Sequence, residues 1–120
     1  MMTQQKANEL LRKWVRILTL QDWTIRVIPN ALPEDMIEGG AGEVQWKESI
    51  KTAVIRILDE ACYGDRIVPF RFEKTLIHEL LHLKFCLLGE SGNPLQDRLV
   101  HQLIDDMARI LYTFHGEAAR

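Results

Sequence analysis

The chain has 120 residues, 47% apolar and 27% charged, with a formal net charge of −2 at pH 7. This composition is near the globular average, so we expect a single domain over residues 1–120. The charge excludes the basic surface typical of nucleic-acid binding, and no apolar run approaches the roughly 20 residues that span a bilayer. Residues 1–10 lack a secretion signal's apolar segment and there are only two cysteines, so we expect a cytoplasmic protein with reduced thiols.

The N-terminal half predicts one helix and three strands. From about residue 4 to residue 18, apolar side chains recur with helical spacing, as in an amphipathic helix. Three segments rich in β-branched and aromatic residues follow, at 23–28, 42–47 and 52–58. The proline- and glycine-rich segment 29–42 favours an exposed loop with solvated acids. The segment KESIK, residues 47–51, between the second and third strands is short enough for a hairpin. We therefore expect at least one antiparallel strand pair.

The C-terminal half predicts two helices. The first runs from about residue 71 to residue 88 and ends at Gly89. The second begins where Asn93 can cap it and Pro94 can take the first helical position, and continues to about residue 114. The order of helix, three strands and two helices predicts an α+β fold with the helices packed on a small sheet.

The segment TLIHELLHLKF, residues 75–85, places two histidines and a glutamate in an otherwise apolar helix. Residues i and i+4 share one helix face, so His78 and His82 can offer imidazole nitrogens to one ion. Zinc is the expected metal, since a catalytic zinc site takes three such protein ligands and leaves one position to water. Glu79 would then act as the general base. The competing interpretation is two ordinary, partly buried histidines.

The third ligand is expected on the last helix, because a short loop joins the two helices as antiparallel neighbours. In such a pair, a residue of the first helix lies level with a residue of the second along the helix axes when their numbers sum to about 182. This places His101 near the level of His82. Asp97 is the alternative, because it lies closer to the apolar stripe of that helix. Height slightly favours His101, and Glu90 in the turn is a third candidate.

Two further residues could complete this site. Asp105 is expected near the height of His78, where it could accept a hydrogen bond from the ring nitrogen that does not bind metal. Cys86 lies four residues after His82 and could be a fourth ligand, although a buried free thiol is favoured. Tyr63, Tyr112 and His115 are conceivable oxyanion donors, but packing or surface roles are favoured for each.

The motif HELLH, residues 78–82, resembles that of the zincin metallopeptidases. The order of elements is similar to the small single-domain gluzincin-like proteins, including the minigluzincins and the phage-type metallopeptidases. The resemblance implies zinc bound by His78 and His82, with Glu79 as the general base. A gluzincin carries a glutamate ligand followed four residues later by an aspartate, whereas HQLID, residues 101–105, has a histidine at the first of these positions. The extended metzincin motif is absent.

Two hypotheses follow from the sequence. The first is a zinc-dependent metallopeptidase whose partner is a peptide or protein substrate. The second is a non-catalytic zincin-like module that binds metal or a protein and needs a partner to complete its cleft. They differ in what Glu79→Gln does, because only the peptidase loses a function while keeping its metal.

Overall fold

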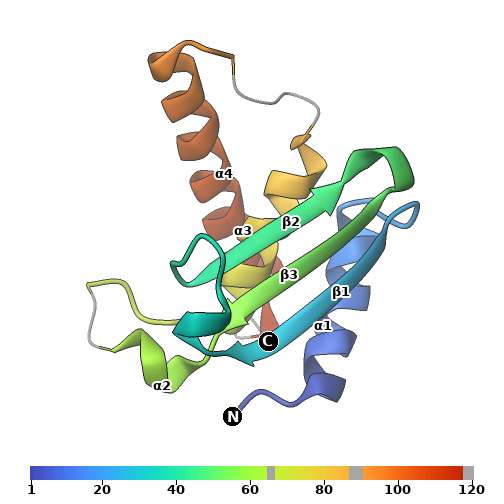
Figure 1. Cartoon of the computed structure of the whole chain (residues 1–120), viewed down its shortest axis with the longest axis vertical. Coiled ribbons are helices and arrows are strands. Elements are labelled where there is room, and N and C mark those ends of the chain that lie inside the picture. The colour runs from blue at the N-terminus through green and yellow to red at the C-terminus, as the bar shows by residue number, and fades with distance from the viewer. Residues whose placement is uncertain (65–66, 87–90, 118–120) are drawn as a thin grey trace.

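The computed structural model describes residues 1–64, 67–86 and 91–117. The α-helices and β-strands of this part of the chain, labelled in Figure 1, are α1 (Gln4–Ile17), β1 (Thr24–Ala31), β2 (Gly42–Lys47), β3 (Thr52–Leu58), α2 (Glu60–Tyr63), α3 (Phe72–Lys84) and α4 (Pro94–His115). The predicted α+β fold is therefore confirmed. The short helix α2 was not predicted. α3 ends at Lys84 with Phe85 as its C-cap, short of the predicted end at residues 88–89, which lie outside the described residues. None of the described helices has the length and apolar character needed to cross a bilayer.

The three strands form one sheet in the order β1-β3-β2. β2 and β3 pair antiparallel across a short turn at Glu48–Ile50, which confirms the predicted hairpin. β1 pairs parallel with β3, which the sequence pattern did not indicate. β1 also extends through Pro29 to Ala31, so the prediction of a loop from residue 29 was wrong at its start. An edge strand tolerates proline, because one side of its backbone has no ladder bond to make.

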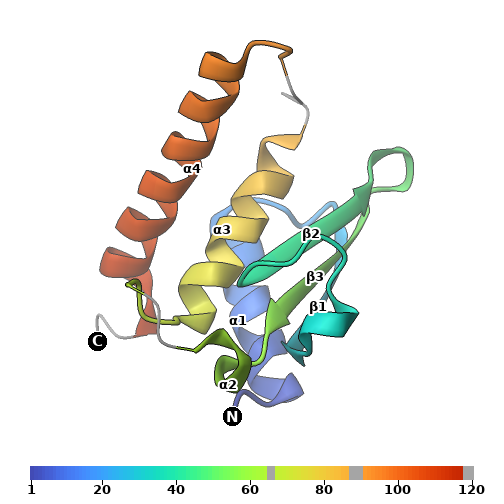
Figure 2. The same cartoon turned by 60° about the vertical axis from the view of Figure 1, so that its left-hand side comes forward.

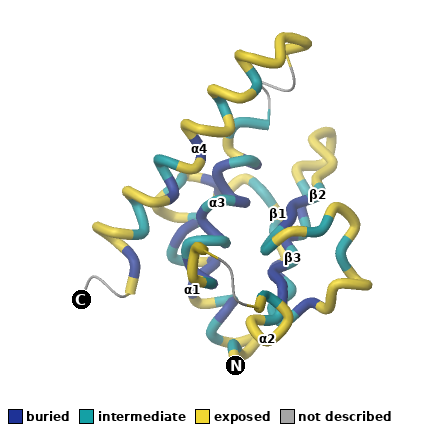
Figure 3. Tube along the Cα trace, turned by 90° about the vertical axis from the view of Figure 1, so that its left-hand side faces the viewer, coloured by how far each residue is buried: buried dark blue, intermediate teal, exposed yellow. Residues whose placement is uncertain are grey.

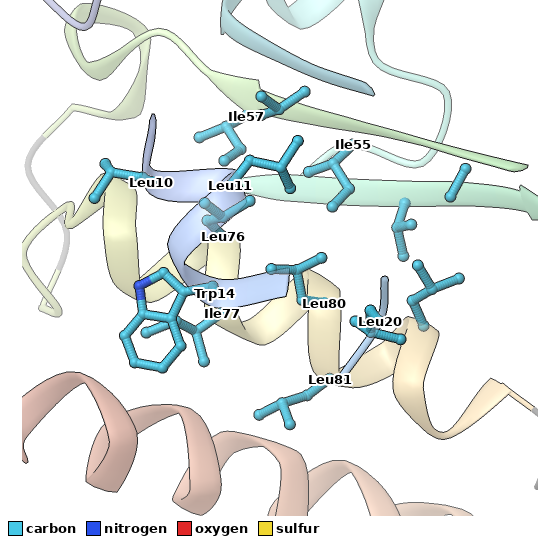
Figure 4. Packing of buried hydrophobic residues seen from close by; sticks show 14 of the residues in the cluster. Leu10, Leu11, Trp14, Leu20, Ile55, Ile57, Leu76, Ile77, Leu80 and Leu81 are labelled. Atoms are coloured by element: carbon cyan, nitrogen blue, oxygen red, sulfur yellow. The ribbon is translucent and has the colours of Figure 1, made fainter. Parts of the chain in front are cut away.

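The helices cover one face of this sheet (Figures 1 and 2). α1 packs against β1, and α3 packs against β2 and β3. Alternate residues of β3 point into the core, where Ala53, Ile55 and Ile57 are essentially inaccessible. Figure 4 shows Ile55 and Ile57 against side chains of the two helices, including the fully buried Trp14. Burial of this apolar surface is the main favourable contribution to folding.

α4 lies on α3 but buries little of its own apolar surface. Its predicted N-cap is present, since Asn93 Oδ1 accepts hydrogen bonds from the backbone N–H groups of Leu95 and Gln96. Within the helix only Ile104 and Ala108 are buried. Much of α4 is coloured as exposed in Figure 3. A second apolar row of this helix is exposed and comprises Leu95, Leu99, Leu103, Ile110 and Phe114. The apolar stripe read from the sequence is thus divided between the core and the surface.

Glu73 joins three elements at the base of α3. Its carboxylate accepts hydrogen bonds from the Trp14 indole at 2.7 Å, from Lys13 Nζ at 3.0 Å and from the Glu117 backbone N–H at 2.8 Å. Burial by itself would raise the pKa of Glu73, but these three donors outweigh it and lower the pKa. The contacts tie α1 and the end of α4 to the start of α3.

Candidate metal centre

The motif helix α3 exposes only one side. Leu76, Ile77, Leu80, Leu81 and Leu83 are all buried in the core, so the histidines are left on the side that faces α4. His78 and His82 are each partly buried there. The apolar spacing of the helix therefore determines which way the two imidazoles point, because the leucines must face the core.

The two imidazoles converge. His78 Nε2 and His82 Nε2 are 3.0 Å apart. A tetrahedral zinc ion with bonds of about 2.0–2.1 Å holds two ligand nitrogens roughly 3.3 Å apart, so a small adjustment would let both bind one ion. Burial lowers the pKa of His78, and it lowers the pKa of His82 to about 4. Both rings are thus neutral at pH 7, which is the form that binds metal.

Asp105 lies behind His78, on the side away from His82. Its Oδ1 is 3.0 Å from His78 Nδ1. A proton on Nδ1 would face this carboxylate, and His78 Nε2 would then be the acceptor in its present 3.0 Å contact with His82 Nε2 and the atom that binds a metal. α4 thereby places a carboxylate next to the ring nitrogen of His78 that a metal would leave unbound.

Glu79 lies beside the histidines and is only 7% exposed. Among the described residues no hydrogen-bond donor reaches its carboxylate, and burial, with the nearby charges of Glu38 and Glu43, raises its pKa to about 8. Gly42 makes room for it, since a Cβ at that position would lie 3.3 Å from Glu79 Oε2 and 2.6 Å from Thr75 Cγ2. The start of β2 thus passes directly over Glu79.

The two candidates for the third ligand differ in their present contacts. The His101 ring is exposed, and its centroid lies 5.2 Å from that of His82. Asp97 Oδ1 instead accepts hydrogen bonds at 2.9 Å from both the backbone N–H and the hydroxyl of Ser91. Within the described part of the chain, no three His, Cys, Asp or Glu side chains already form a group that could hold a metal ion. Glu90 lies outside the described residues.

The histidines and Glu79 line a cleft of about 620 Å³ between β2, α3 and α4. Both third-ligand candidates line it too. The rest of its wall is largely apolar: Val44, Trp46, Phe85, Val100 and Ile104. A concave site with a few polar groups set in an apolar wall is typical of small-molecule and peptide binding.

The other residues singled out in the sequence are placed less favourably. Cys86 is a free thiol lining the same cleft, and burial raises its pKa. The Tyr63 hydroxyl donates to the Val68 carbonyl at 2.7 Å and lines a hollow beside His78 and Glu79. Tyr112 lines a different hollow near the N-terminus, and the His115 carbonyl accepts a hydrogen bond from Lys13.

Several residues of the cleft were missed in the sequence. Trp46 was not singled out there, yet it is 43% exposed on the cleft wall. Glu38 was assigned to a solvated loop, yet it lines the cleft, and Glu43 is 2% exposed. The three glycines at positions 39, 40 and 42 were the available signal, because they mark a loop that bends tightly against its surroundings.

Comparisons with protein-family models, with curated proteins and with solved structures find no match. The likeness to zincins therefore depends on residues 78–82, the order of the elements and the site geometry described above.

Proposed function

We propose that this protein is a zinc-dependent metallopeptidase of the zincin type. The observation that carries the proposal is the convergence of His78 Nε2 and His82 Nε2, 3.0 Å apart, in a cleft that also contains Glu79. The hydrogen-bond distance between His78 and Asp105 supports it, since a metal-binding histidine normally has such a partner on its second nitrogen. We also propose a cytoplasmic location, which suits the free thiols Cys62 and Cys86.

His78, His82 and His101 would hold the metal. We choose His101 over Asp97 because the Asp97 carboxylate is already hydrogen-bonded to Ser91. Zinc, when bound, would supply a water molecule whose pKa is lowered to about 7.

Glu79 would take the proton from the attacking water and pass it to the amine that leaves the cleaved peptide bond. Burial raises the pKa of Glu79 to about 8 in the metal-free protein, so the carboxyl then holds its proton at pH 7. A zinc ion beside it would favour the charged carboxylate, the form that accepts a proton. The cleft walls would align the peptide carbonyl with the water, and the side chains of β2 and α4 that line the cleft would keep bulk water out.

A second candidate is the non-catalytic module that binds metal or a protein. One observation favours it: α4 exposes a row of apolar side chains. Such a row is common where a partner protein binds.

Metal content and peptide hydrolysis together test the proposal. Purified protein is expected to contain about one zinc per chain, and His101→Ala is expected to lose it while Asp97→Ala retains it. Glu79→Gln should keep the metal but lose peptide hydrolysis by at least about 100-fold. Metal retention without hydrolysis of any peptide by the wild type would support the non-catalytic candidate, and failure to take up zinc would reject both metal-dependent functions.

A further inference from the structure

Acidic side chains gather in the lining of the metal cleft. Glu38, Glu43 and Asp97 belong to the lining together with Glu79, whereas no lysine or arginine among the described residues lines it. A cleft with one sign of charge and apolar walls concentrates ligands of the opposite charge. The Glu79 side chain lines this cleft, belongs to a residue that is 7% exposed, and has no hydrogen-bond donor among the described residues, so a ligand in the cleft could supply one.

Only one of these carboxylates is available to a ligand side chain. Glu43 lies 3.6 Å from Arg56, and Asp97 is hydrogen-bonded to Ser91. Glu79 lies beside the zinc-binding histidines, where the peptide bond would react. Glu38 is exposed at the rim of the cleft and makes no ion pair with any described residue.

The position of Glu38 is determined by Glu43. The Glu43 carboxylate, 2% exposed, accepts backbone hydrogen bonds from Ile37 at 2.8 Å, from Glu38 at 2.8 Å and from Gly39 at 3.3 Å. Gly39 has φ +87°, a left-handed conformation that glycine adopts without strain. Glu43 is therefore a positioning residue, because it holds the backbone of residues 37–39 in place at the rim of the cleft. The Glu38 side chain starts from this held backbone and lines the cleft.

We propose that Glu38 selects peptide substrates that carry a basic side chain close to the cleaved bond. The proposal rests on the proposed peptidase function. Glu38 lies only four residues before Gly42, which passes directly over Glu79, so a side chain paired with Glu38 belongs to a residue near the reacting carbonyl. A lysine or arginine ammonium or guanidinium would give that exposed carboxylate a charged partner.

The test measures binding separately from turnover. Zinc-loaded Glu79→Gln is titrated calorimetrically with a set of octapeptides in which one lysine is moved along an otherwise neutral chain, and with the same peptides carrying norleucine or glutamate instead. The best lysine peptide is expected to bind about 3–5-fold more tightly than its norleucine counterpart at low salt, with a smaller ratio at 0.5 M salt. The glutamate peptide is expected to bind most weakly.

Matched variants in the Glu79→Gln background assign the effect to one residue. Glu38→Gln should remove the lysine preference and Glu38→Lys should reverse it. Glu34→Gln, which changes an exposed acid of the same loop outside the cleft lining, should leave the preference unchanged.

Equal affinity for the lysine and norleucine peptides, or a lysine preference that survives Glu38→Gln, would overturn the inference while leaving the peptidase intact. If the zinc-loaded protein bound no peptide at all, the proposed function itself would fail and this inference with it.

Discussion

The imidazole of His78 has its two nitrogens directed at different partners, with Asp105 on one side and the ring of His82 on the other. Asp105→Ala removes the acceptor that holds the proton on Nδ1 and should weaken zinc binding by about 10–100-fold. Asp106→Ala is the control, because this neighbouring acid bonds to Arg109 instead. Competition with a chromogenic chelator measures both affinities. Equal affinities for the two variants would show that Asp105 has no part in holding the ligand.

Gly42 has a steric role as a single residue, because a side chain at this position would meet Thr75. Gly42→Ala places a methyl group 2.6 Å from Thr75 Cγ2, which should destabilise the fold by about 1–3 kcal/mol, measured by urea unfolding. Thr75→Ser removes that Cγ2 methyl and should restore much of the lost stability in the double variant. An additive loss in the double variant would mean that the contact with Thr75 is not the cause.

At the scale of elements, Glu73 joins α1, α3 and the end of α4. Its folded pKa is lowered, so it contributes stability above its unfolded pKa of about 4.5, and this contribution is lost as the pH falls through the folded value. Glu73→Gln should therefore cost about 1–3 kcal/mol at pH 7, and its difference from wild type should shrink below about pH 4.

Denaturant unfolding measured from pH 3 to pH 8 follows this difference. Glu9→Gln is the matched control, because it neutralises an exposed acid on α1 and should behave like the wild type at every pH. A cost of Glu73→Gln that stayed constant down to pH 3 would exclude the charge of Glu73 as its source.

α4 should respond very differently to substitutions on its two apolar sides. Leu103→Gln changes a side chain that is 52% exposed and should alter the free energy of unfolding by less than about 0.5 kcal/mol. Ile104→Ala, at a 2% exposed position, should cost about 2–4 kcal/mol because it leaves a cavity. Chemical denaturation of both variants makes the comparison. Similar costs would mean that the outer row is covered, as it would be in an oligomer.

At the scale of the whole molecule, the proposed metal joins α3 to α4 through His82 and His101. Zinc bound only to the folded protein stabilises it by about 4 kcal/mol at 1,000 times its dissociation constant, which should raise the Tm by about 10 °C or more. His82→Ala should abolish this rise, and magnesium, which prefers oxygen ligands, should not produce it in the wild type. Differential scanning calorimetry at several zinc concentrations tests the expectation.

Much of the fold followed from local patterns. The alternation of residues 52–58, the helical spacing of residues 4–17 and the cap at Asn93 each depend on neighbours a few positions away, so the sequence alone indicated these elements. The spacing of His78 and His82 is equally local, since one helical turn brings them together whatever surrounds the helix. Zinc binding and hydrolysis remain predictions.

The remaining features depend on contacts between residues far apart in the chain. The parallel pairing of β1 with β3 and the division of the α4 apolar surface were decided only when the elements packed. The burial of Glu43 combines both ranges: its backbone donors Ile37 and Glu38 lie in the preceding loop, whereas Arg56 comes from β3. Local patterns along the chain therefore indicate most of the elements and the motif, whereas packing between distant segments places the side chains that share the cleft.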